Sequence, residues 1–178
     1  MIRLYEIDDE YVEYLRKFDK KVLSPKTEDR KQTRKYIGII LNTQSFNYFI
    51  PLSSYKPETY DSMYESISLK KIEDMAVLRI NNMIPVVDNV VHEIKFSLVI
   101  DEQYRTLLQN EYRIIKARER EIRTDARIVY FYRLNNKNKN KGLYKICCDF
   151  KLLENATQKW VDSDSSSKKI LVGSVSTT

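Results

Sequence analysis

The chain has 178 residues, of which 42% are hydrophobic and 31% charged, a composition typical of a soluble globular protein with its own core. No apolar run approaches the ~20 residues that cross a bilayer. The acidic N-terminal segment lacks the apolar stretch of a signal peptide, so the sequence predicts a cytoplasmic protein without a membrane partner. The adjacent Cys147 and Cys148 and a single histidine match neither a disulfide nor a zinc site, and we expect no metal or cofactor.

The net charge of +6 is concentrated in two basic tracts. Residues 16–35 hold nine Lys/Arg against three acids, and residues 113–145 hold eleven against three, so the remaining chain is acidic. Either tract alone is typical of a solvated helix face, but two together predict contact with a polyanion. Because the chain also has 13 Tyr and 6 Phe, whose rings can stack on unpaired bases, RNA is favoured over duplex DNA.

Five short runs rich in β-branched and aromatic residues predict strands. They lie at residues 36–41, 46–51, 76–80, 83–87 and 93–100. Residues 42–45 join the first two as a hairpin, and Pro51 ends the second, because proline cannot donate to a central ladder. Residues 60–69 fit neither a strand nor a helix clearly.

Apolar residues recur at helical spacing in three other segments. These predicted helices run from Asp8 or Asp9 to about Lys20, from 101 to about 126, and from 150 to 160. Polar residues 21–33 and 135–142 are expected to be loops. The sequence thus predicts an α+β fold, an antiparallel sheet with peripheral helices. It forms one domain over residues 1–162, followed by a flexible tail at 163–178.

The second strand ends in FIPLSSYKP, where Ser53, Ser54, Tyr55 and Lys56 follow one another. A polar turn with a solvated lysine is the simplest interpretation. Metal-free cleavage of RNA nevertheless needs such groups. The 2′-hydroxyl attacks the adjacent phosphate, one group accepts its proton, another protonates the leaving oxygen, and cations or hydrogen-bond donors stabilise the developing charge. The lone His92 is more often structural at such a position.

Five segments, in chain order, carry a family resemblance: YEIDDEYVEYLRKFDKKV, KYIGIILNTQSFNYFIPLSSYKP, INNMIPV, YRTLLQNEY and CDFKLLE. Together they resemble the ToxN/AbiQ family, the toxins of type III toxin–antitoxin systems, from residue 4 to about 155. The resemblance implies a sequence-selective, metal-independent endoribonuclease that leaves 2′,3′-cyclic phosphate and 5′-hydroxyl ends. It also implies a strongly twisted antiparallel sheet like that of the Kid/MazF toxins.

The same resemblance implies the partners. A pseudoknot-like repeat RNA would be the antitoxin, which the toxin cuts into units and then binds. Cellular and phage mRNA would be the substrates, with a role in abortive infection. The free toxin would be a monomer, and RNA would drive it into a closed ring of alternating protein and RNA.

Functional positions of the family fall on five residues. Ser53, Ser54 and Lys56 match its hydroxyl pair and lysine, Tyr11 matches a tyrosine of its N-terminal helix, and Arg34 matches a basic residue before its second block. Tyr55 stands where the family often has proline. Cationic residues in the basic tracts, together with Tyr55, are the expected RNA contacts. They are Lys20, Lys21, Lys35, Tyr55, Arg118, Arg120, Arg123, Lys137, Lys139 and Lys141.

Two other classes of function fit the sequence without the resemblance. The chain could be a non-catalytic RNA-binding regulatory module, or it could bind an acidic protein through its basic long helix.

Overall fold

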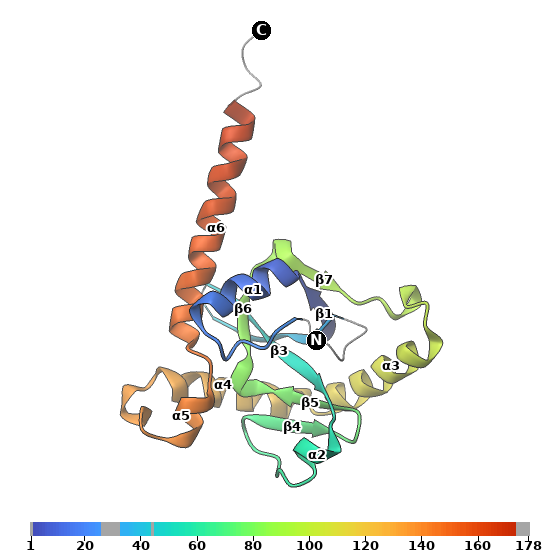
Figure 1. Ribbon diagram of the computed structural model, residues 1–178. Coiled ribbons are helices and arrows are strands. Elements are labelled where there is room, and N and C mark those ends of the chain that lie inside the picture. Colours follow the sequence, from blue (N-terminus) through green and yellow to red (C-terminus); the bar gives the residue numbers. More distant parts are fainter. Residues whose placement is uncertain (1, 26–32, 44, 174–178) are drawn as a thin grey trace.

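The computed structural model describes residues 2–25, 33–43 and 45–173, with side chains up to residue 163, and contains a seven-stranded antiparallel sheet (Figure 1). The strands are β1 Arg3–Ile7, β2 Lys35–Asn42, β3 Asn47–Ser54, β4 Leu69–Ile72, β5 Ala76–Arg79, β6 Ile84–Val86 and β7 Val91–Glu93. Their order is β4-β5-β3-β2-β1-β7, and β6 also pairs with β3. The predicted α+β class is confirmed.

Helices surround this sheet. They are α1 Asp9–Phe18, α2 Pro57–Tyr60, α3 Glu102–Ala117, α4 Glu119–Leu134, α5 Gly142–Ile146 and α6 Phe150–Gly173, with 3₁₀ turns η1 Ile80–Asn82, η2 Asp88–Val90, η3 Phe96–Leu98 and η4 Asn136–Asn138. Helices α1 and α6 contact each other beside β6, α3 contacts β4, and α4 contacts β2. The C-terminal part of α6 projects beyond the rest of the molecule (Figure 1). No helix in the described part of the chain is long and apolar enough to span a membrane.

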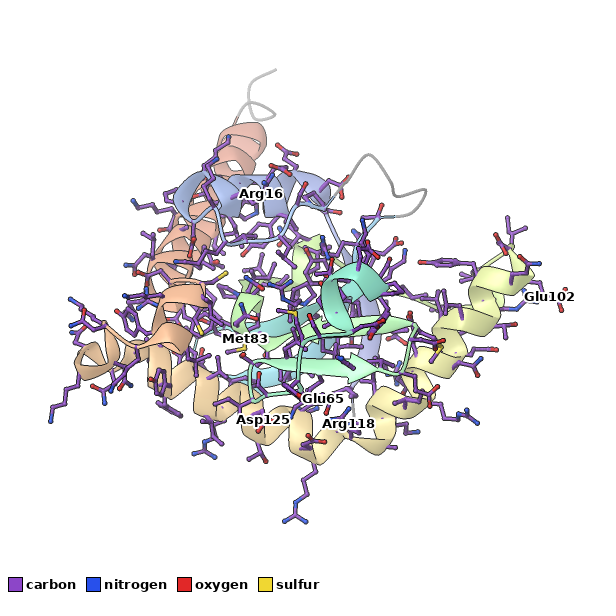
Figure 2. The ribbon with its side chains drawn as sticks, turned by 60° about the horizontal axis from the view of Figure 1, so that its bottom comes forward. Arg16, Glu65, Met83, Glu102, Arg118 and Asp125 are labelled. Carbon is purple, nitrogen blue, oxygen red and sulfur yellow. The ribbon has the colours of Figure 1, made fainter. Side chains whose placement is uncertain are left out.

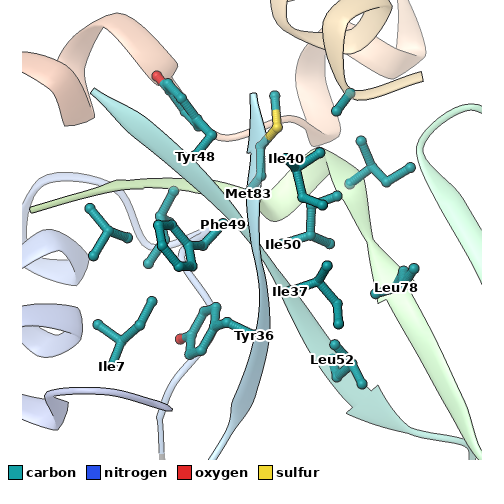
Figure 3. Packing of buried hydrophobic residues seen from close by; sticks show 14 of the residues in the cluster. Ile7, Tyr36, Ile37, Ile40, Tyr48, Phe49, Ile50, Leu52, Leu78 and Met83 are labelled. Atoms are coloured by element: carbon teal, nitrogen blue, oxygen red, sulfur yellow. The ribbon is translucent and has the colours of Figure 1, made fainter. Parts of the chain in front are cut away.

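The hairpin β2–β3 forms as predicted, with Ile37 opposite Ile50. The prediction that Pro51 ends the second strand is wrong, because β3 continues to Ser54 with Pro51 opposite Tyr36. On its other edge, Pro51 falls between the residues that pair with β6 and those that pair with β5, where it has no ladder partner among the described residues. Successive side chains point to opposite faces, so Tyr36 and Phe49 lie on one side while Ile37 and Ile50 pack on the other (Figure 3). Residue 38 must be glycine, because a Cβ atom there would overlap the Phe49 ring.

Strand β3 lies at the centre of the sheet and is paired along both edges. On the edge away from β2, residues 47–49 pair with β6 and residues 52–54 pair with β5. This pairing places Ser53 opposite Val77 and Ser54 opposite Ala76. The backbone of both serines is therefore fixed by the sheet before the chain turns into α2.

Two strands were not predicted, and one predicted strand does not form. Strand β1 contains Arg3, Tyr5 and Glu6 and lacks a clear apolar alternation, while β4, with the sequence LKKI, lies just after the ambiguous 60–69 segment. Residues 93–100 do not form a strand, since only Val91–Glu93 pairs with β1 and a 3₁₀ turn follows. Strand β1 begins at Arg3, so beyond the Tyr5–Glu93 pair it offers only Leu4 and Arg3, and the Ile94 N–H already donates to the Leu4 carbonyl.

The long helix predicted over 101–126 is two helices that meet at Arg118, and the second continues to Leu134. Figure 2 shows Arg118 at this bend, next to Glu65, which precedes β4 in the chain. Each of the two helices buries its own row of apolar residues, and the helical spacing of these residues continues across the bend. The periodicity alone therefore does not reveal the bend.

The ends of two other segments also differ from the prediction. Residues 135–142, expected to be a flexible loop, contain η4 and the start of α5. Helix α6 runs to Gly173, past both the expected end at 160 and the boundary at 162. Cys147 and Cys148 are free and fully buried, as small hydrophobic residues would be.

Candidate functional site

Ser53 of β3 is joined to Arg34, the residue just before β2. Arg34 is only 5% exposed, and its Nη1 donates to the Ser53 hydroxyl at 3.0 Å and to the Leu52 carbonyl at 2.9 Å. Its Nε donates to the Ser24 carbonyl at 2.9 Å, so three acceptors fix the plane of the guanidinium. The structure thus brings together two of the predicted catalytic residues and orients both.

Ser54 and Lys56 follow Ser53 in the chain, and both are exposed. Ser54 is the last residue of β3, and Lys56 is the extended N-cap of the short helix α2, which begins at Pro57. A hydroxyl and an amine are therefore presented to solvent at the end of a strand whose position is fixed by pairing on both sides. Such an arrangement can hold a phosphate group, because it combines a positive charge with oriented donors.

Tyr55 fills the position between them with a half-buried ring. Its hydroxyl donates to Asp61 Oδ1 at 2.7 Å, a bond that raises the pKa of the phenol, and its backbone N–H donates to the Met75 carbonyl. Its ring packs on Tyr60, with centroids 5.7 Å apart, while Lys71 Nζ lies 5.8 Å from the ring centroid. These contacts restrict the backbone at Tyr55, as a proline would at this position. They therefore also restrict the positions of its two neighbours, Ser54 and Lys56.

Arg79 belongs to the same face of the sheet and was missed by the sequence interpretation. Ser53 is opposite Val77, so Arg79, two residues along β5, is its diagonal neighbour on one face, at about 7–8 Å between Cα atoms. Arg79 is half-buried, and its Nε is buried without an acceptor. Its Nη1 reaches only the Tyr60 hydroxyl at 3.4 Å.

Among the described residues Arg79 forms no ion pair, although a desolvated cation is costly without a counterion. The position therefore fits an anion brought by a ligand. Only the β3–β5 register places Arg79 near Ser53, and no motif in the sequence indicates it.

Tyr11 occupies a different environment. It is fully buried, and its hydroxyl bonds the Pro85 carbonyl at 2.9 Å and Thr157 Oγ1 at 2.8 Å. Burial raises the pKa of this phenol, so the hydroxyl stays protonated. No contact among the described residues joins Tyr11 to Ser53, Ser54 or Lys56, and the catalytic part implied by the resemblance stays a prediction.

The predicted RNA contacts divide into exposed and engaged residues. Lys20, Lys21, Arg120, Lys137, Lys139 and Lys141 are exposed. By contrast, Lys35 is buried in an ion pair with Glu6, and Arg123 bonds Glu119 and the carbonyls of Ile39 and Ile40. Arg118 bonds Glu65, which lies beside it in Figure 2. It also bonds Glu121, and the two carboxylates raise the pKa of Arg118 further. The exposed group is thus better placed to meet a polyanion.

His92 lies on the edge strand β7, which β1 and β2 separate from Ser53 of β3 in the sheet order, and its Nε2 is 2.7 Å from Asp8 Oδ1. Within the described ranges, no three His, Cys, Asp or Glu side chains gather as metal ligands would.

Comparison with known proteins gives consistent matches over most of the chain. The family model described as "Toxin ToxN, type III toxin-antitoxin system" matches residues 3–158. The chain is 29% identical to Endoribonuclease ToxN of Bacillus thuringiensis subsp. kurstaki, over 94% of this chain and 88% of that protein. It is 34% identical to Endoribonuclease AbiQ of Lactococcus lactis subsp. lactis, over 86% of each.

Two solved structures share the fold. One, described as a type III toxin–antitoxin system with selective toxin inhibition by a non-coding RNA pseudoknot, has a TM-score of 0.78 at 30% identity and covers 89% of this chain and 97% of its own. The other is AbiQ, described as a lactococcal anti-phage endoribonuclease, with a TM-score of 0.77 at 29% identity, covering 91% and 99%.

Proposed function

The chain belongs to the ToxN family of toxins from type III toxin–antitoxin systems, and we propose that it is a sequence-selective endoribonuclease acting in the cytoplasm. The observation that carries this proposal is the pairing of Arg34 with Ser53 beside the exposed Ser54 and Lys56. Relatives of similar length are named endoribonucleases, which supports the same activity here.

The proposed chemistry needs no metal ion. The 2′-oxygen of one nucleotide attacks its own 3′-phosphorus and loses its proton, while the 5′-oxygen of the next nucleotide leaves and gains one. The products are a 2′,3′-cyclic phosphate and a 5′-hydroxyl. Charge accumulates on the non-bridging oxygens, where Lys56 and Arg34 supply positive charge and the Ser54 hydroxyl supplies a donor.

Arg79 extends this site. Because its guanidinium shares a face with Ser53 and lacks an acid partner among the described residues, we assign it a phosphate of the same RNA. Tyr55 is held by its hydrogen bond to Asp61 and its ring contact with Tyr60. It thereby fixes the backbone between Ser54 and Lys56 and keeps these two side chains at a constant separation.

We further propose that a repeat RNA with a pseudoknot is the antitoxin, as described for the structural relative. The free protein is expected to be a monomer, and RNA to drive it into a closed ring, because a head-to-tail interface either closes or grows without limit. Light scattering of the protein alone and with one-repeat RNA tests this. A stable protein-only dimer, or a complex that stops at one protein and one RNA, argues against the ring but leaves the nuclease untouched.

The catalytic assignment is tested with Ser54→Ala and Lys56→Ala. Each should lower the single-turnover cleavage rate by about 10²–10³, because a preorganised donor or charge is lost from the transition state. Ser97→Ala and Lys95→Ala are matched controls, since both side chains are exposed in the segment after β7. If the folded Ser54→Ala and Lys56→Ala proteins cut RNA as fast as these controls, the assignment is wrong.

A further inference from the structure

A second concave site lies at the other end of β3 from Ser53 and Lys56. This α4–α6 cleft has a volume of about 770 Å³ and is bounded by the β2–β3 turn, the second half of α4 and the start of α6. The catalytic serines are at the far end of the same strand. The distance from Asn47 to Ser54 is about 23 Å at ~3.3 Å per residue. The cleft is thus separate from the site already described.

One wall of the cleft is aromatic and positively charged. Phe131 lines it with 56% of its surface exposed, so the face of its ring is accessible to a ligand. The Arg127 guanidinium lies 6.0 Å from the centre of the Phe131 ring, and the largely exposed Lys151 lies on the α6 side. A base of single-stranded RNA can stack on an exposed aromatic ring such as that of Phe131. The neighbouring cations can neutralise the charge of its phosphate.

The floor of the cleft carries a buried hydrogen-bond acceptor. Glu154 is only 7% exposed, and its Oε1 accepts from the hydroxyls of Tyr48 at 3.0 Å and Tyr130 at 2.7 Å. Burial, and then the neighbouring carboxylate, raise the pKa of Tyr130, so both phenols remain donors. Among the described residues, Oε2 of Glu154 accepts only from Lys151 Nζ, at a long 3.4 Å, and retains acceptor capacity for an N–H group of a ligand.

From this geometry we propose that the α4–α6 cleft binds an unpaired nucleotide of RNA, with its base on Phe131, its phosphate at Arg127 and Lys151, and a base N–H directed to Glu154. This inference rests on the proposed function, since it takes RNA to be the ligand. It gives the protein a second RNA surface about one strand length from the cleavage site.

Photo-cross-linking tests the proposal directly. The probe is a single-stranded octanucleotide that is 2′-O-methylated throughout and contains one 4-thiouridine. Because it lacks a free 2′-hydroxyl, it reports on binding whether or not the protein cleaves RNA by the proposed route. After irradiation and trypsin digestion, mass spectrometry should find the probe on the peptide of residues 128–133, which contains Phe131.

Phe131→Ala should lower the cross-link yield on that peptide at least about fivefold, as expected for loss of one base–ring stack, whereas Phe131→Tyr should restore it. Leu98→Ala, which removes an exposed apolar side chain elsewhere, is the matched control. Cross-links confined to residues 53–56, or a yield on 128–133 that Phe131→Ala leaves unchanged, would overturn the proposal and leave the cleft to a protein ligand. Failure of the wild-type protein to cut unmodified RNA is a separate result that concerns only the nuclease.

Discussion

Nη1 of Arg34 lies 3.0 Å from Oγ of Ser53, so a buried cation immediately before β2 donates a hydrogen bond to a hydroxyl of β3. Because Ser53 accepts this bond, its own proton is directed to another acceptor. The same Nη1 donates to the Leu52 carbonyl, which fixes the hydroxyl and the cation relative to the sheet. This pair is the rigid part of the site, and Ser54 and Lys56 are its exposed part.

Arg34→Lys should lower the cleavage rate by about 10², although it keeps the charge. An ammonium cannot reproduce the planar fork that reaches Ser24, Leu52 and Ser53 at once. Single-turnover kinetics with a short RNA measures the effect, and Arg3→Lys, at an exposed ion pair, is the matched control. Equal rates for the two variants would show that charge alone matters at this position.

Arg79→Met should affect activity and stability in opposite directions. Removal of a half-buried cation that has no ion pair in the described structure should leave the urea midpoint unchanged or raise it. If the cation holds a phosphate, the same substitution should lower cleavage at least about tenfold. A destabilised but fully active variant would instead assign Arg79 a purely structural role with Tyr60.

Lys137, Lys139 and Lys141 are exposed around η4 and should contact phosphates without reading bases. Reversal of all three to Glu should weaken binding of repeat RNA and reduce the salt slope by about 0.7 for each lost phosphate contact to single-stranded RNA. Lys95→Glu, outside both basic tracts, controls for a general change in net charge. An unchanged slope in the triple variant would place the RNA elsewhere.

Glu111, on the buried side of α3, makes stability depend on pH. Burial raises its pKa to about 7, above the ~4.3 of a glutamate in an unfolded chain. Its contribution to stability is therefore full below about pH 4.3 and is lost as pH rises through about 7.

Glu111→Gln stays neutral, so it should match the wild type below about pH 4.3 and exceed it at pH 8 by an amount on the order of 3 kcal/mol in urea unfolding. Glu10→Gln, an exposed position on α1, is the control. A constant difference at both pH values would contradict the assignment.

The sequence predicts most of what depends on local pattern. The β2–β3 hairpin follows from its apolar runs, and α1 begins at the aspartates where the pattern places its start, but β3 runs past Pro51, which the sequence analysis takes as its end. What it misses depends on pairing between distant segments. Strand β1 is recognisable only by its partners β2 and β7, and Arg79 joins the site only through the β3–β5 register.

The basic tracts show the same limit. Count and position predict a polyanion surface, but they cannot show that Arg118, Arg123 and Lys35 are engaged in ion pairs. The break at Arg118 is equally invisible in the local pattern, and the Glu65 carboxylate that Arg118 bonds there is 53 residues away in the chain.

Cleavage of total cellular RNA by the purified protein in excess EDTA, followed by end-group analysis, tests the central claim most directly. We predict discrete fragments with 2′,3′-cyclic phosphate and 5′-hydroxyl ends, produced at the same rate with and without EDTA and lost in Lys56→Ala. RNA that is bound but remains intact, or fragments that appear only when a divalent metal is added, would contradict the proposed metal-independent nuclease.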